Sequence, residues 1–175
     1  MKTLLTALAA LTFWLSAAAR AEVARAAADS FLLVEQADSQ ASPADAITAF
    51  GEVAHWWNSE HSYSGKSASL HLVLTPGGCF CEEWSGGAVE HARVVTVLSG
   101  RLVRLRGALG PLQGKAVDAI LDFSAAGSEG GGMTRLKLTY VVNGSAASEL
   151  DKLATPVDAV LKDALQRLAD YLQTR

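Results

Sequence analysis

The sequence predicts an α+β fold, in which a curved antiparallel sheet of about seven strands wraps round a long C-terminal helix. Two short helices are expected after the first strand. Three observations support this fold class. Apolar and polar residues alternate over several segments separated by short glycine-containing turns. Two Ser/Thr-Pro pairs mark helix starts, and the C-terminal segment carries one apolar stripe at helical spacing.

The strands are expected where the apolar residues recur at every second position, or where valine and leucine are concentrated between turns. Short turns between successive strands indicate antiparallel pairing. An alanine-rich stretch, residues 22–28, precedes the first strand and is expected to be frayed. The expected strands span residues 30–39, 70–75, 79–84, 89–98, 101–106, 117–123 and 134–142.

The helix predictions depend on capping residues. Ser42 caps the first helix, Pro43 takes its first position, and Asp45 faces the positive end of the helix dipole. A second short helix is expected over residues 52–57. The long helix is predicted to begin at Thr155-Pro156 and to bury an apolar stripe against the sheet.

The N-terminus reads as a secretory signal peptide over residues 1–21. Lys2 precedes an uncharged apolar run, and Ala19-Arg20-Ala21 fits a cleavage site before Glu22. The alternative is an uncleaved anchor, which the short run disfavours. Residues 22–175 would then form one exported domain, periplasmic or secreted, without stable membrane insertion.

The formal net charge of the 175-residue chain is −3 at pH 7, and loss of Lys2 and Arg20 makes the domain more acidic. An acidic surface argues against nucleic-acid binding, which needs a basic face.

The stretch from His55 to Trp84 holds three of the four tryptophans, both cysteines and three of the four histidines. Its segments HWWNSEHSYSG and GGCFCEEW resemble the SRPBCC superfamily of helix-grip proteins. This superfamily includes START, polyketide-cyclase and Hsp90-activator-like (AHSA1) domains, and the resemblance is closest to the bacterial AHSA1- and polyketide-cyclase-like members. Further matching pieces are Val89-Glu90-His91, the loop 107–112 and the final helix. The resemblance implies a helix-grip fold, on which binders, transporters and enzymes all occur.

A strongly curved sheet cannot contact a straight helix along its whole length, so a cavity is expected between them. We therefore predict an exported domain that binds a small hydrophobic molecule in this cavity, with the glycine-rich loop 107–114 as its gate. No cofactor or metal is expected, and whether the domain has a protein partner is left open. The expected ligand-binding residues are Trp57, Tyr63, Leu72, Cys79, Cys81, Glu83, His91, Tyr140, Leu161 and Leu165.

Two alternatives remain open. The first is a cyclase- or aromatase-like enzyme, which would use His91 or Glu83 inside the cavity as an acid or base. A buried titratable pair in the cavity would favour catalysis, whereas apolar rings and thiols alone would favour binding. For His91 itself, a position at the surface or rim is favoured over one inside the cavity. The second alternative is a protein-interaction module with a filled core and no ligand.

The paired residues Trp56 and Trp57 point about 100° apart on a helix, so one is expected to be buried and the other to lie near the cavity opening. Cys79, Cys81 and Glu83 are predicted to share one strand face. On a regular strand the two cysteine Cα atoms would lie about 6.5–7 Å apart, at the limit for a disulfide, so two unpaired thiols are expected. Cys-x-Cys without a second pair is a weak metal motif.

Overall fold

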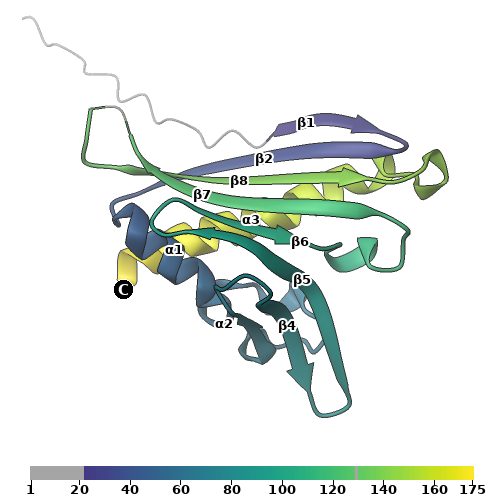
Figure 1. Cartoon of the computed structure of the whole chain (residues 1–175), viewed down its shortest axis with the longest axis horizontal. Helices are drawn as coiled ribbons and strands as arrows, with labels where there is room; N and C mark the ends of the chain where they lie inside the picture. The colour runs from purple at the N-terminus through teal and green to yellow at the C-terminus, as the bar shows by residue number, and fades with distance from the viewer. Residues whose placement is uncertain (1–21, 129) are drawn as a thin grey trace, which may run out of the picture.

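A computed structural model describes residues 22–128 and 130–175, so the predicted signal peptide lies outside the described residues. Within the described part, all the strands belong to one antiparallel sheet of eight strands in the order β1-β2-β8-β7-β6-β5-β4-β3. Figure 1 shows this curved sheet beside the long C-terminal helix α3. The strands are β1 (Glu22–Ala27), β2 (Ser30–Ser39), β3 (Leu70–Leu72), β4 (Cys79–Trp84), β5 (Gly87–Leu98), β6 (Leu102–Arg106), β7 (Asp118–Gly127) and β8 (Thr134–Asn143).

The predicted fold class is confirmed, with one strand more than expected. The alanine-rich stretch that was expected to be frayed forms the edge strand β1. This strand and β2 make an antiparallel hairpin. Its small side chains gave no alternating pattern, and its position follows from the neighbouring strand. The strand expected over residues 70–75 is shorter, because pairing with β4 covers only Leu70–Leu72.

Two helices follow β2, as predicted. Helix α1 (Pro43–Gly51) begins at Ser42, whose Oγ accepts the N–H of Asp45 at 3.1 Å. Helix α2 (Val53–Trp56) is a single turn that ends before Trp57. Phe50 of α1 stacks on Phe123 of β7 with 4.4 Å between ring centroids, which fixes α1 against the sheet.

The C-terminal helix α3 (Asp151–Thr174) starts five residues earlier than predicted, because its first helical residue is Asp151 and not Pro156. The extra turn lets Leu150 and Ala154 enter the core, where both are buried. Pro156 therefore lies inside the helix and cannot donate to the carbonyl of Lys152. The burial of this additional apolar surface outweighs the lost hydrogen bond.

The C-terminal half of α3 packs closely on the sheet, and its buried stripe includes Leu165, Leu168 and Leu172. Within the sheet, β2 is the main neighbour of α3. At the start of the helix, the N–H of Leu150 donates to the carbonyl of Ala28, in the turn between β1 and β2, at 2.9 Å. No helix within the described residues is long and apolar enough to cross a membrane.

Candidate functional site

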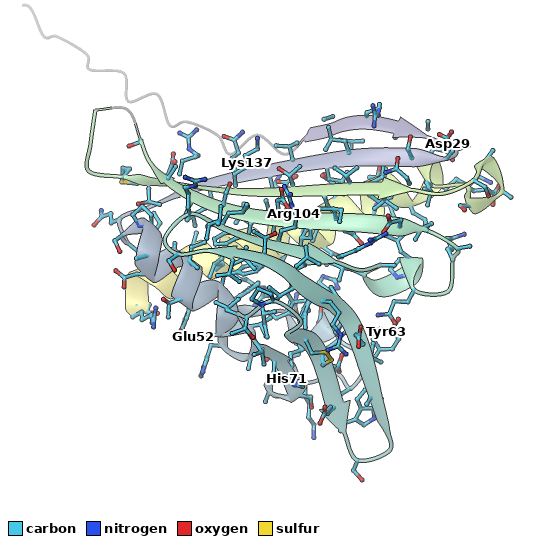
Figure 2. The ribbon with its side chains drawn as sticks, in the orientation of Figure 1. Asp29, Glu52, Tyr63, His71, Arg104 and Lys137 are labelled. Atoms are coloured by element: carbon cyan, nitrogen blue, oxygen red, sulfur yellow. A yellow bond between two sulfur atoms is a disulfide. The ribbon has the colours of Figure 1, made fainter. Side chains whose placement is uncertain are left out.

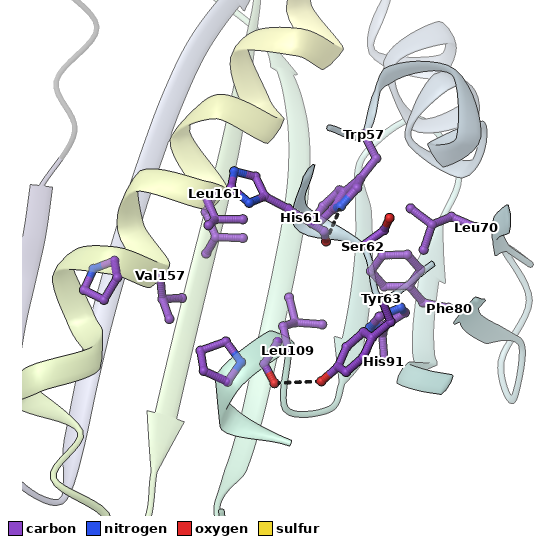
Figure 3. A pocket seen from close by; sticks show the side chains of 14 residues that line it. Trp57, His61, Ser62, Tyr63, Leu70, Phe80, His91, Leu109, Val157 and Leu161 are labelled. Atoms are coloured by element: carbon purple, nitrogen blue, oxygen red, sulfur yellow. Dashed lines mark hydrogen bonds between the residues drawn. The ribbon is translucent and has the colours of Figure 1, made fainter. Parts of the chain in front are cut away.

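A pocket of about 400 Å³ lies between the first half of α3 and the part of the sheet formed by β3, β4 and β5. Its volume is at the small end of the range typical of small-molecule sites. A cavity between the sheet and the helix, as predicted, is therefore present beside the first half of α3. Figure 3 shows the residues that surround it. They are Trp57, His61, Ser62, Tyr63, Leu70, Phe80, His91, Leu109, Gly110, Pro111, Pro156, Val157, Val160 and Leu161.

Aromatic rings form the wall on the sheet side. Trp57 meets Phe80 edge-on, with 5.7 Å between ring centroids, and Phe80 lies 4.9 Å from the imidazole of His91. The indole N–H of Trp57 donates to the carbonyl of His61 at 3.0 Å, which fixes the ring against the following loop. On the opposite wall, α3 contributes the apolar side chains of Val157 and Leu161 (Figure 3). The lining is therefore mainly apolar.

His91 brings a polar group into this apolar lining because of a β-bulge. Phe80 pairs with Ala92 and Cys81 pairs with Glu90, so His91 is the extra residue of β5 between two regular pairs. His91 and Ala92 are both buried although they are adjacent, which a regular strand does not permit. Bulges of this kind commonly redirect a side chain next to a functional site.

A fully buried carboxylate stands behind His91. Oε2 of Glu82 lies 3.2 Å from Nε2 of His91, and the side chain of Glu82 has no solvent exposure. The backbone N–H groups of Tyr63 and Ser64 donate to the same carboxylate at 3.0 and 2.5 Å. Burial alone would raise the pKa of Glu82, but the hydrogen bonds from Ser64, Tyr63 and His91 together lower it below its usual value. Glu82 is therefore ionised at neutral pH.

His91 is held neutral at pH 7. Burial lowers the pKa of its imidazole, and the nearby Glu82 carboxylate opposes that shift only in part. An ionised carboxylate only accepts hydrogen bonds, so Nε2 of His91 carries the proton and donates it to Glu82. Nδ1 then keeps its lone pair. This tautomer makes His91 a hydrogen-bond acceptor or a general base.

Two loops meet at the mouth of the pocket. The hydroxyl of Tyr63, a residue 52% exposed, donates to the carbonyl of Gly110 at 3.2 Å (Figure 3). Gly110 has φ of 53°, a backbone conformation that glycine adopts without strain. Behind this loop, the buried hydroxyl of Tyr140 accepts the N–H of Leu109 at 3.0 Å and donates to the carbonyl of Gly107 at 3.1 Å. Tyr140 therefore fixes the loop from below, and burial raises its pKa.

The structure brings together four of the residues predicted to bind the ligand, which all line this pocket: Trp57, Tyr63, His91 and Leu161. Trp56 is buried and Trp57 borders the pocket, so the division of roles expected for the pair is present. The remaining six residues do not line the pocket. These are Leu72, Cys79, Cys81, Glu83, Tyr140 and Leu165.

The exclusion of Glu83 has a simple geometric cause. Phe80 and Glu82 of β4 point inward and are buried, so Cys79, Cys81 and Glu83 share the outer face of the sheet. The prediction that these three residues share one face is confirmed, but that face is turned away from the cavity. The acidic residue near His91 is therefore Glu82. The sequence could have indicated Glu82, because it alternates with the apolar residue Phe80.

The expectation of two free thiols is wrong. Cys79 and Cys81 form a disulfide, with their Cα atoms 5.3 Å apart. The expectation assumed a fully extended strand, whereas the backbone is contracted here, next to the irregular step in the pairing of β4 with β5. Within the described residues, these cysteines and Glu90 are the group whose donor atoms lie close enough to hold a metal ion, and they are outside the pocket.

No protein-family model matches the sequence, and no curated protein matches it significantly. Solved structures do resemble it. The protein MLL2253 from Mesorhizobium loti has a TM-score of 0.58 at 13% identity, over 82% of this chain and 97% of that one. DynU16, encoded in the dynemicin biosynthetic locus, has a TM-score of 0.58 at 17% identity, over 82% of this chain and 47% of its own.

The di-domain ARO/CYC StfQ from the steffimycin biosynthetic pathway has a TM-score of 0.57 at 12% identity, over 85% of this chain and 52% of its own. This chain therefore spans about half the length of DynU16 and StfQ. The architecture of one curved antiparallel sheet with a long C-terminal helix is a helix-grip fold, and these proteins share it.

Proposed function

We propose that this protein is an SRPBCC-type domain that binds a small hydrophobic molecule in the pocket between the sheet and α3. The observation that carries the proposal is a mainly apolar pocket of about 400 Å³ whose lining includes the buried imidazole of His91. Burial of apolar ligand surface would supply the affinity. The unprotonated Nδ1 of His91 would orient the ligand by accepting a hydrogen bond from a hydroxyl or N–H group.

The test uses a fluorescent apolar probe, 1-anilinonaphthalene-8-sulfonate, and one pair of variants. Val160 lines the pocket, whereas the next residue towards the N-terminus, Ala159, is exposed outside it. Val160→Trp should fill the pocket and weaken probe binding at least tenfold, and Ala159→Trp should leave it unchanged. Equal binding by the two variants would refute the proposal. If probe binding differs as expected, native mass spectrometry of the protein purified from its own cells would identify a ligand that co-purifies.

A second candidate function is general acid/base catalysis of the cyclase or aromatase type. The buried pair of His91 and Glu82 favours it, because a base fixed by a carboxylate inside an apolar pocket is a recurrent catalytic arrangement. In this role Nδ1 of His91 would take a proton from a carbon next to a carbonyl group. Glu82 would stabilise the imidazolium ion that forms.

Deuterium exchange at the methyl group of acetophenone, an apolar aryl ketone, tests this role. Wild-type protein in D₂O should accelerate the exchange, as followed by NMR, and His91→Gln should abolish the acceleration. A wild-type rate no faster than that of His91→Gln, with the fluorescent probe still bound by both, would leave binding as the only function of the pocket.

Export is a further part of the proposal, and the sequence of residues 1–21 supports it. The mature protein would begin at Glu22 and would be periplasmic or secreted. Intact-mass measurement of protein purified from the periplasm and from the cytoplasm of its own cells tests both statements. A full-length mass in every fraction would contradict them.

A further inference from the structure

A second chemically distinct site lies on the outer face of the sheet, outside the pocket. The disulfide between Cys79 and Cys81 is partly exposed there, and Figure 2 draws it as a yellow bond on β4. Each cysteine lies between residues of the neighbouring strands. Cys81 is opposite His71 on β3 and Glu90 on β5, and Cys79 is opposite Arg93 on β5.

This disulfide is poorly suited to stabilising the fold. It closes a ring around one intervening residue, so it removes little entropy from the unfolded chain. Both cysteines belong to β4, which the sheet already joins to β3 and β5. The bond therefore links no two elements that would otherwise separate. Exposed disulfides of this kind are more often reactive than structural.

The charged groups around the sulfur atoms are arranged unevenly. Arg93, the cross-strand neighbour of Cys79, favours a thiolate there. The carboxylate of Glu90 lies within 4.8 Å of both sulfur atoms and therefore acts on both cysteines. Cys81 in addition precedes Glu83 on the same outer face, and this second carboxylate disfavours a thiolate there. Together with the exposed imidazole of His71, these are the titratable and charged groups next to the two cysteines on β3, β4 and β5.

A metal ion is a weaker occupant for this site. The carboxylate of Glu90 lies close enough to both sulfur atoms to share a cation with them. It is already paired with the guanidinium of Arg93, which also donates to the carbonyl of Gly77 at 3.1 Å. A cation would have to displace this fixed positive charge. The same charge favours an anionic sulfur atom, as thiol chemistry requires.

We propose that Cys79 and Cys81 form a redox-active site that exchanges its disulfide with small monothiols of the glutathione class. The thiolate of the small thiol attacks Sγ of Cys81, and the bond between the two cysteines breaks. The electron pair goes to Sγ of Cys79, which leaves as the thiolate next to Arg93. A mixed disulfide remains on Cys81.

A second small thiol completes the exchange. Its thiolate attacks the sulfur atom of the first small thiol and releases Cys81, which takes a proton from solvent. The two small thiols are oxidised to one disulfide, and the protein disulfide is reduced to two thiols. This activity is independent of any ligand in the pocket.

Two single-cysteine variants test the proposed asymmetry. Cys81→Ser keeps Cys79, and Cys79→Ser keeps Cys81. Alkylation by iodoacetamide, followed by intact mass against pH, should show a midpoint about one pH unit lower for Cys79 than for Cys81. In the Cys81→Ser background, Arg93→Gln should raise the Cys79 midpoint and Arg93→Lys should preserve it. Arg104→Gln should also preserve it, because Arg104 pairs with Asp122 elsewhere on the outer face.

Wild-type protein supplies the second readout. Reduced glutathione should open the disulfide in the folded protein, and oxidised glutathione should restore it through a mixed disulfide visible by mass. Circular dichroism and probe binding establish that each variant is folded. A disulfide that opens only when the protein unfolds would overturn the proposal, as would equal midpoints for the two cysteines. Stoichiometric Zn²⁺ binding that blocks alkylation of both thiols would assign the pair to a metal site instead.

Discussion

Oε2 of Glu82 accepts hydrogen bonds from the backbone N–H of Tyr63 at 3.0 Å and from Nε2 of His91 at 3.2 Å. One buried oxygen atom therefore joins the base of the pocket to the loop at its mouth. The charge on Glu82 sets the tautomer of His91, and its position holds Tyr63 over the opening. A change at Glu82 should affect both.

The substitution Glu82→Gln tests this connection. Glutamine has one acceptor oxygen, so the N–H groups of Tyr63 and Ser64 and the imidazole of His91 cannot all keep their partner. We expect unfolding to become easier by about 1–3 kcal/mol and the amide of Tyr63 to exchange faster with D₂O. The matched control is Glu83→Gln, on the exposed outer face of the same strand, which should change stability by less than about 0.5 kcal/mol. Similar losses in both variants would contradict the assigned role.

The stability of the protein should fall as the pH drops below about 6.5. Because the pKa of His91 is lower in the folded protein than its usual value of 6.5, the unfolded chain binds a proton first. The lowered pKa of Glu82 extends the loss of stability below pH 4.5. Denaturant unfolding measured between pH 7 and pH 3 checks this dependence. His91→Gln should flatten the upper part of the curve, and parallel curves above pH 5 would refute the explanation.

Tyr140 should act on the pocket without touching a ligand. Tyr140→Phe leaves the N–H of Leu109 and the carbonyl of Gly107 without their partner in a buried setting. We expect a loss of about 1–3 kcal/mol in stability and weaker binding of the fluorescent probe, because the loop loses its support. Thermal unfolding and probe titration measure the two effects. Unchanged probe affinity in a destabilised variant would limit the role of Tyr140 to the core.

The adjacent tryptophans should separate stability from binding. Trp56 is buried, stacks on Phe50 at 5.8 Å and donates its indole N–H to the carbonyl of Ala49 at 2.9 Å. Trp56→Ala should therefore reduce the free energy of unfolding by about 3–5 kcal/mol. Trp57→Ala should reduce it by less and should lower probe affinity more strongly. The reverse order of the two effects would show that the assigned roles are exchanged.

The sequence was sufficient for most of the architecture, although not for the edge strand β1. The alternation of Leu136, Leu138 and Tyr140 defined a strand, Ser42-Pro43 located a helix start, and the leucine stripe defined α3. These signals are local, so they can be read without knowing what lies nearby. The start of α3 was misplaced, because the capping pattern at Thr155-Pro156 is outweighed by the burial of Leu150, which only the folded protein reveals.

The site was harder to predict, because it depends on departures from regular geometry. Alternation leaves the direction of His91 ambiguous, and the bulge that turns it inward has no distinctive sequence signal. The two backbone N–H groups that bind Glu82 belong to Ser64 and Tyr63, 18 and 19 residues earlier in the chain, in a loop without periodicity. The disulfide was missed for a related reason, since regular strand spacing was assumed at Cys79 and Cys81.

The extra residue in β5 sets a limit on how this domain can be stabilised. Deleting His91 would put Glu90 and Ala92 in succession and restore an uninterrupted outward–inward alternation opposite β4. A continuous ladder of this kind favours the sheet, but the deletion removes the buried imidazole of the pocket. Selection for thermal stability alone is therefore expected to remove the bulge from this strand. The result would be a more stable protein whose pocket has lost its function.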